Sequence, residues 1–105
     1  MQIMTDFSVA IVGDAFVDII AAGLDRLPTF GKDAFANAVS IHTGSSAGNT
    51  ALNLAALRAA TSYFTSVGSD EFGAMFVRTM TEAGIDCSGV QKCSNSTAVC
   101  IVLSS

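Results

Sequence analysis

The hydrophobic positions of this chain follow two spacings, one typical of strands and the other of helices. Three short apolar runs are rich in β-branched side chains, and the first two end at glycine: residues 7–13 (FSVAIVG), 61–68 (TSYFTSVG) and 97–103 (TAVCIVL). The first run has the form of a buried parallel strand, the second has strand composition, and the third is strongly β-prone. They predict three strands, spread from the start of the chain to its end.

A second kind of extended sequence lies between the first two of these runs. Residues 19–24 (IIAAGL) are apolar, and residues 33–43 (DAFANAVSIHT) alternate loosely between apolar and polar. The segment 27–31 (LPTFG) separates them, and its proline and glycine predict a turn. The alternation predicts one or two strands with one covered face, formed by Phe35, Val39 and Ile41.

Helical spacing begins at Asn49, where the sequence reads NTALNLAALRAA. Small apolar residues recur there at the interval of one helix face, which predicts a helix packed closely on its neighbours. The buried stripe is predicted to contain Ala51, Leu54, Ala55 and Leu57.

A second helix is predicted after Ser69 and Asp70, either of which can cap its first turn. An acidic residue, Glu71, follows them and favours the positive end of the helix dipole. Gly84 has the position of a residue that ends a helix. The buried stripe is predicted to contain Phe72, Met75, Phe76 and Met80.

The predicted order is therefore strand, extended hairpin, helix, strand, helix, strand. Strands that alternate with helices form parallel β–α–β units, and a hairpin inserted among them forms a separate flap or lid. The chain stops at the end of a strand with no closing helix, so we expect a truncated domain. We expect an α/β fold over residues 1–105, with the inserted hairpin forming the flap or lid.

Composition agrees with a folded core and argues against several partner classes. Half of the residues are hydrophobic and 13% are charged. The mean hydropathy of +0.54 is high, so we expect part of the surface to be covered by the rest of a longer chain or by a partner. The net charge is −4 and no basic cluster occurs, which argues against nucleic acid. No apolar run approaches the roughly 20 residues that span a bilayer, and residues 1–8 lack a secretory signal.

The three cysteines, Cys87, Cys93 and Cys100, have no metal-binding spacing. The single histidine, His42, is far from them in sequence, so a zinc site is not predicted. An odd number of cysteines favours reduced thiols and a cytoplasmic location.

The segment that carries chemistry is the small-residue loop at residues 43–49 (TGSSAGN), which leads into the first predicted helix. The N–H groups at a helix N-terminus favour oxygen-rich ligands, although a simple helix cap explains the same residues. No Gly-Lys-Ser/Thr follows, as a phosphate-binding loop would require. The loop also does not follow the first strand, as a dinucleotide-binding turn would.

Several motifs in order along the chain resemble the N-terminal part of the ribokinase-like PfkB carbohydrate kinases. The loop from Gly44 to Ala51 resembles the family's glycine loop with its asparagine, and 67–73 (VGSDEFG) resembles its Val-Gly-x-Asp-x-x-Gly motif. Gly13 to Asp18 resembles the first strand, with an aspartate five residues after a glycine. Further matches lie at 27–28, 31–32, 84–86 and 96–98.

Two residues depart from this signature. Ser45 stands where a second glycine is usual, and its β-carbon would crowd the site if the backbone there requires a positive φ. Arg58 stands where glycine or serine usually ends the helix, so that end must be formed differently.

The resemblance implies a fold, an activity and a set of binding residues. The fold is the N-terminal part of a three-layer α/β sandwich with a β-sheet lid, and the lid segments are expected at about 18–43 and 96–104. The activity is ATP-dependent phosphorylation of a sugar hydroxymethyl group. Asp18 is expected to accept hydrogen bonds from two substrate hydroxyls, and Asn49 both to donate and to accept. Simple turn and cap roles are the alternatives for these two. The implied substrate-binding residues are Asp18, Gly44, Ser45, Ser46 and Asn49.

The catalytic base of the family lies in a Gly-Ala-Gly-Asp motif that this chain does not contain. The resemblance also implies ATP and Mg²⁺, with no binding residue for either in this chain, so the chain alone is expected to be inactive. A homodimer formed through the lid is consistent with the family. The alternatives are a nucleoside kinase of the adenosine type, a non-catalytic protein that binds a sugar or a partner, and an unrelated α/β module.

Overall fold

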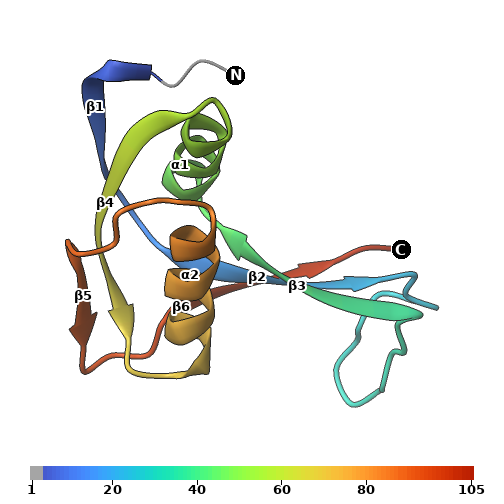
Figure 1. Cartoon of the computed structure of the whole chain (residues 1–105). Helices are drawn as coiled ribbons and strands as arrows, with labels where there is room; N and C mark the ends of the chain where they lie inside the picture. Colours follow the sequence, from blue (N-terminus) through green and yellow to red (C-terminus); the bar gives the residue numbers. More distant parts are fainter. Residues whose placement is uncertain (1–3) are drawn as a thin grey trace.

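Two three-stranded sheets organise the chain, which a computed structural model describes over residues 4–105 (Figure 1). The first sheet has the strand order β1-β4-β5 and the second has the order β3-β2-β6. The elements are β1 (Met4–Val12), β2 (Phe16–Ala22), β3 (Ala38–Gly44), α1 (Ser46–Ala56), β4 (Ala59–Gly68), α2 (Glu71–Glu82), β5 (Val90–Cys93) and β6 (Ala98–Leu103).

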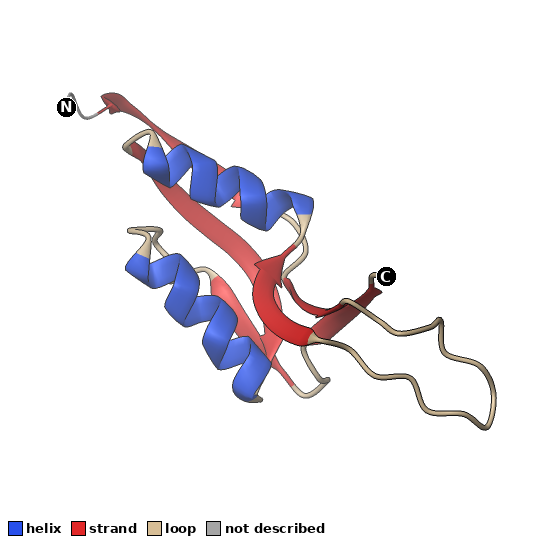
Figure 2. Ribbon diagram, turned by 90° about the vertical axis from the view of Figure 1, so that its right-hand side faces the viewer, coloured by secondary structure: helices blue, strands red, loops and turns tan. Residues whose placement is uncertain are grey.

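The first sheet is parallel throughout, as the alternation of strands and helices predicts. Val12 of β1 pairs with Phe64 of β4, and Thr65 of β4 pairs with Val90 of β5. Both helices lie on the same face of this sheet, one beside the other (Figure 2). The opposite face carries exposed side chains, among them Val12 and Phe64.

The core lies between this sheet and its two helices. Tyr63 of β4 and Phe76 of α2 are both fully buried, and their rings meet edge to face with centroids 5.6 Å apart. Burying an aromatic or aliphatic side chain of this size stabilises the fold by about 1.5–3 kcal/mol. The other buried members of this cluster are Ala15, Ala51, Val67, Met80 and Ile85.

Helix α1 begins earlier than its apolar spacing predicts. Its first residue is Ser46, and the side chain of Ser45 caps it by accepting a hydrogen bond from the Gly48 N–H. The predicted start at Asn49 is therefore wrong, because the cap lies within the small-residue loop. Leu57 is also wrongly assigned to the buried stripe: it follows the last helical turn and is 65% exposed.

Helix α2 agrees with its prediction at both ends. Asp70 is the N-cap and accepts a hydrogen bond from the Gly73 N–H, while Gly84 has a φ of +91° directly after the helix end. Phe76 and Met80 are buried, whereas Phe72 and Met75 at the same helical interval are partly buried. Neither helix of residues 4–105 is long and apolar enough to cross a membrane.

The second sheet contains the predicted hairpin and adds the last strand to it. Strands β2 and β3 are antiparallel and are joined by a loop over residues 23–37, while β6 pairs with β2 in parallel. Strand β2 begins at Phe16, so Asp18 lies inside the strand. Phe35 lies in the loop and is 68% exposed, so its assignment to the face of Val39 and Ile41 is wrong.

The two faces of the second sheet differ in chemistry because successive side chains of a strand point to opposite faces. One face, which we call the apolar lid face, is formed by Ile19, Val39, Ile41, Val99, Ile101 and Leu103. The other carries Asp18, with His42 and Cys100 as its cross-strand partners. The sequence pattern alone could not have joined β6 to the hairpin, because more than fifty residues separate them.

Candidate functional site

Asp18 and Gly44 lie in contact on the second sheet. A β-carbon built on Gly44 would lie 2.7 Å from Asp18 Oδ1 and 2.9 Å from Oδ2, closer than side-chain atoms pack. The carboxylate therefore rests over the Gly44 backbone, at the end of β3 and beside the start of α1. Only glycine leaves room for this approach. Asp18 is partly exposed, so its oxygens are available to a ligand.

Ser45 follows Gly44 in an unusual backbone conformation. Its φ of +87° and ψ of 148° belong to a region that glycine adopts and other residues rarely do. Its hydroxyl donates to the Asp14 carbonyl at 2.9 Å and accepts from the Gly48 N–H at 2.8 Å, and it lies 3.4 Å from the Tyr63 hydroxyl. These bonds offset part of the strain. They also turn the Ser45 hydroxyl toward the protein rather than toward a ligand.

Tyr63 and Asp14 belong to the same hydrogen-bond network, and sequence reasoning missed their roles. The Tyr63 hydroxyl donates to the Asp14 carbonyl at 2.6 Å. Burial raises the pKa of the Tyr63 phenol, the bond to Ser45 lowers it, and the charge of Asp14 raises it. The phenol therefore stays protonated and acts as a donor at neutral pH. No sequence signal connects two residues that are 49 positions apart.

Ser46 and Asn49 lie on the first turn of α1, three residues apart, so their side chains are neighbours on one helix face. Both are exposed. The Asn49 backbone N–H donates to the Ser45 carbonyl at 3.0 Å, as expected in the first turn of a helix. The structure thus brings Asp18 and Gly44 into contact and sets Ser46 and Asn49 on the helix that follows directly.

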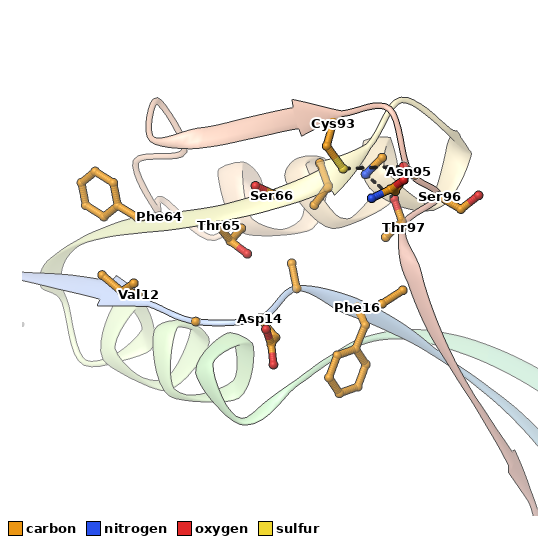
Figure 3. A pocket seen from close by; sticks show the side chains of 15 residues that line it. Val12, Asp14, Phe16, Phe64, Thr65, Ser66, Cys93, Asn95, Ser96 and Thr97 are labelled. Carbon is orange, nitrogen blue, oxygen red and sulfur yellow. Dashed lines mark hydrogen bonds between the residues drawn. The ribbon is translucent and has the colours of Figure 1, made fainter.

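A cavity of about 730 Å³ opens where the two sheets meet, and none of the five predicted binding residues is among those that line it (Figure 3). Its walls are the carboxyl ends of β1, β4 and β5 and the starts of β2 and β6, a location where α/β proteins bind ligands. Phe16 and Ala98 line it, and this cross-strand pair lies two residues before the pair of Asp18 and Cys100. The polar lining residues are Asp14, Thr65, Ser66, Asn95, Ser96 and Thr97.

The chemistry of these groups suits a neutral, hydroxyl-rich ligand. An ionised carboxylate accepts hydrogen bonds, an amide both donates and accepts, and a helix N-terminus presents N–H donors. No group of three or more His, Cys, Asp or Glu side chains that could hold a metal ion occurs among residues 7–105, whose side chains the structure describes.

Comparison with known proteins finds a family and several solved structures that this chain resembles. The family described as "pfkB family carbohydrate kinase" matches residues 6–105. No curated protein matches the sequence. Among solved structures, a PfkB protein from Polaromonas sp. JS666 is 26% identical with a TM-score of 0.73, and it covers 88% of this chain. The fructokinase of Xylella fastidiosa with bound ATP is 26% identical with a TM-score of 0.74 and 91% coverage.

A more distant structure supports the fold alone. The ribokinase of Thermotoga maritima is 19% identical, with a TM-score of 0.78 over 91% of this chain. This chain spans only 29% of the Polaromonas protein, 29% of the fructokinase and 32% of the ribokinase. The matched region is therefore about a third or less of each solved protein. The observed fold is the ribokinase-like α/β arrangement with a second β-sheet that the sequence predicts.

Proposed function

The chain belongs to the pfkB family of carbohydrate kinases, and from this premise we propose that it forms the sugar-binding part of an ATP-dependent sugar kinase. In the reaction, a sugar hydroxymethyl oxygen forms a bond to the γ-phosphorus of ATP and the bond from that phosphorus to ADP breaks. The hydroxyl proton passes to a base that lies outside this chain. Positioning of the sugar is the contribution that residues of this chain make.

The observation that carries the proposal is the contact between Asp18 and Gly44 beside the N-terminus of α1. A carboxylate held over a bare backbone can accept hydrogen bonds from two neighbouring hydroxyls without a side chain in the way. Ser46 and Asn49 lie on the first turn of the adjacent helix and supply further polar contacts. For Ser45 we propose a contact through its backbone, because its hydroxyl is held by Asp14 and Gly48.

Membership of the family implies that the whole kinase uses ATP and Mg²⁺. Mg²⁺ would neutralise charge on the phosphates during transfer. The observed donors and acceptors fit the sugar rather than the nucleotide phosphates.

We further propose that the second sheet is the lid of the site, formed by segments at about 18–43 and 96–104. It carries Asp18 on one face and the apolar lid face on the other. Closure of such a sheet over the bound sugar would exclude water from it. The apolar lid face, with Ile101 68% exposed and Val39 64% exposed, is proposed to pair with the same face of a second copy.

Sugar binding by the chain tests the proposal directly. Isotope-labelled protein would be titrated with ribose, fructose and adenosine while backbone amide signals are followed by NMR. We expect shifts at Asp18, Gly44 and Asn49 with a sugar, and their loss in D18A. D33A, which removes a carboxylate from the exposed loop, is the matched control and should bind as the unmodified chain does.

Two results would change the proposal. Shifts with adenosine and none with either sugar would favour a nucleoside kinase. Shifts that persist in D18A would contradict the assigned site. An ADP-release assay is expected to give no signal above a buffer blank for this chain, and a signal above the blank would contradict the placement of the base outside it.

A further inference from the structure

Three short segments connect the two sheets. The chain crosses from β1 to β2 through residues 13–15, returns from β3 to α1 through Ser45, and crosses from β5 to β6 through residues 94–97. Each crossing is a place where the second sheet could rotate relative to the first. The hydrogen bonds at these segments therefore determine how firmly the two sheets are held.

Hydrogen bonds join the first two crossings to each other and to the first sheet. The Asp14 carbonyl on the first crossing accepts from the Tyr63 hydroxyl at 2.6 Å and from the Ser45 hydroxyl, on the second crossing, at 2.9 Å. Tyr63 is fully buried in β4. These bonds fix one side of the junction between the sheets.

The third crossing is held separately, by hydrogen bonds between Asp70 and Thr97. Asp70 Oδ1 accepts from the Thr97 hydroxyl at 2.6 Å and from the Gly73 N–H at 2.9 Å, and Oδ2 accepts from the Thr97 N–H at 2.9 Å. The Thr97 hydroxyl also accepts from the Gly68 N–H at 2.9 Å. One carboxylate thus caps α2 and holds the residue that precedes β6.

Two glycines make this arrangement sterically possible. A β-carbon on Gly68 would lie 2.5 Å from the Asn95 carbonyl oxygen and 2.5 Å from the Thr97 nitrogen. A β-carbon on Gly73 would overlap the Gly68 carbonyl oxygen and lie 2.9 Å from the Thr97 hydroxyl. The Val-Gly-x-Asp-x-x-Gly motif of residues 67–73 therefore forms the surface on which the segment that enters β6 packs.

These contacts fix the start of β6, the strand that pairs with β2 at Asp18. Strand β6 is at the edge of its sheet and pairs with β2, where Ala98 is opposite Phe16 and Cys100 is opposite Asp18. Thr97 directly precedes that ladder. We propose that Asp70, acting through Thr97, is a positioning residue that fixes the second sheet, and with it Asp18, against the first sheet. The consequence for sugar affinity rests on the proposed function, whereas the geometric role does not.

Two variants separate this role from simple stabilisation of α2. In D70S, serine still caps the helix but cannot reach both Thr97 groups. In T97V, a side chain of the same shape loses the hydroxyl. T97S retains the hydroxyl and should restore the wild-type result. T50V is the matched control, because the Thr50 hydroxyl bonds only to the Ser46 carbonyl of its own helix.

Residual dipolar couplings of backbone amides report the orientation of the two sheets in the intact chain. In the unmodified protein, T97S and T50V, we expect one alignment tensor to fit both β1-β4-β5 and β3-β2-β6. In D70S and T97V the couplings of the second sheet should be scaled down relative to the first. One shared tensor in both of these folded variants would overturn the proposal.

Sugar titration supplies the second readout. We expect the affinity of the bound sugar to fall about tenfold in D70S, which corresponds to about 1.4 kcal/mol, the size of one lost hydrogen bond. If D18A abolishes binding while D70S binds as the unmodified chain does with one tensor, the positioning role fails and the proposed function stands. If the unmodified chain binds no sugar, the dipolar couplings still decide the positioning role.

Discussion

The carboxylate of Asp18 rests directly on the backbone of Gly44, so a β-carbon at Gly44 would lie 2.7 Å from Oδ1. The two residues are on neighbouring strands, β2 and β3, and are separated by the long loop of residues 23–37. The contact joins the acid that the sequence singles out to the glycine that opens the small-residue loop. Because the contact is so close, a side chain added at position 44 would collide with the Asp18 carboxylate.

The substitution G44A should therefore displace the Asp18 carboxylate. We expect sugar binding to be lost and the free energy of unfolding to fall by about 1–3 kcal/mol, as for an overpacked site. Urea unfolding and the NMR titration measure the two effects. G31A is a useful control, because its β-carbon meets no atom within 4 Å although its φ of +77° disfavours alanine. It should lose some stability and keep sugar binding.

Ser45 combines backbone strain with a useful hydroxyl, and two substitutions separate these effects. S45A keeps the strain and loses the cap and the bond to Asp14, so we expect it to be destabilised by about 1–3 kcal/mol. S45G loses the same bonds but relieves the positive φ of +87°. Denaturant unfolding should therefore find S45G more stable than S45A by about 1 kcal/mol or more. Equal stability of the two variants would contradict the strain.

Arg58 has a φ of +65° after the end of α1, where its N–H donates to the Ala55 carbonyl at 3.0 Å. Glycine adopts this conformation without the steric cost of a β-carbon. We expect R58G to raise the free energy of unfolding by about 0.5–1 kcal/mol. R58A removes the same side-chain charge without relieving the backbone, and it should show no such gain in thermal or urea unfolding.

Acid should weaken the hydrogen bonds that the Asp70 carboxylate accepts from Thr97 and Gly73. Hydrogen bonds from the Thr97 hydroxyl, the Thr97 N–H and the Gly73 N–H lower the pKa of Asp70 below its ordinary value. Its contribution to stability is therefore fully present above the unfolded-state pKa of about 3.9 and is lost as pH falls through the lower folded-state pKa.

Urea unfolding at a series of acidic pH values should accordingly find a smaller loss of stability in D70S than in the unmodified chain. The pKa of Asp86 is also lowered, by its bonds to Ser88, but this effect is common to both proteins and cancels in the difference. Parallel pH profiles would contradict the role of the Asp70 carboxylate.

The apolar lid face offers a test of self-association. I101E introduces a charge at a side chain that is 68% exposed on this face, and S40E places the same charge on the opposite face. By sedimentation velocity, we expect the unmodified chain and S40E to dimerise with rising concentration and I101E to remain monomeric. An unmodified chain that sediments as a monomer at every concentration would contradict the dimer.

Much of the fold follows from local patterns in the sequence. The β-branched runs ending at Gly13 and Gly68 locate β1 and β4, and the cap at Asp70 with the stop at Gly84 locates α2. These elements are determined by neighbours in the chain, so their signals are local. The predicted start of α1 is wrong because Ser45 caps the helix from a conformation that serine rarely adopts.

The candidate site was only partly predictable. The motifs point to Asp18 and the small-residue loop, but the contact between Asp18 and Gly44 depends on the register of β2 with β3. The bonds from Tyr63 to Asp14 and from Thr97 to Asp70 span 49 and 27 residues. Polar pairs at such separations leave no periodic signal, so they become visible only in the folded chain.

The buried phenol at the junction of the sheets has a spectroscopic consequence. The chain contains one tyrosine and no tryptophan, so all ultraviolet fluorescence from its aromatic side chains comes from Tyr63 and the weakly emitting phenylalanines. The Tyr63 hydroxyl is bonded to the Asp14 carbonyl where the chain passes between the sheets. Its emission is therefore a built-in optical probe of that junction, and it needs no added label.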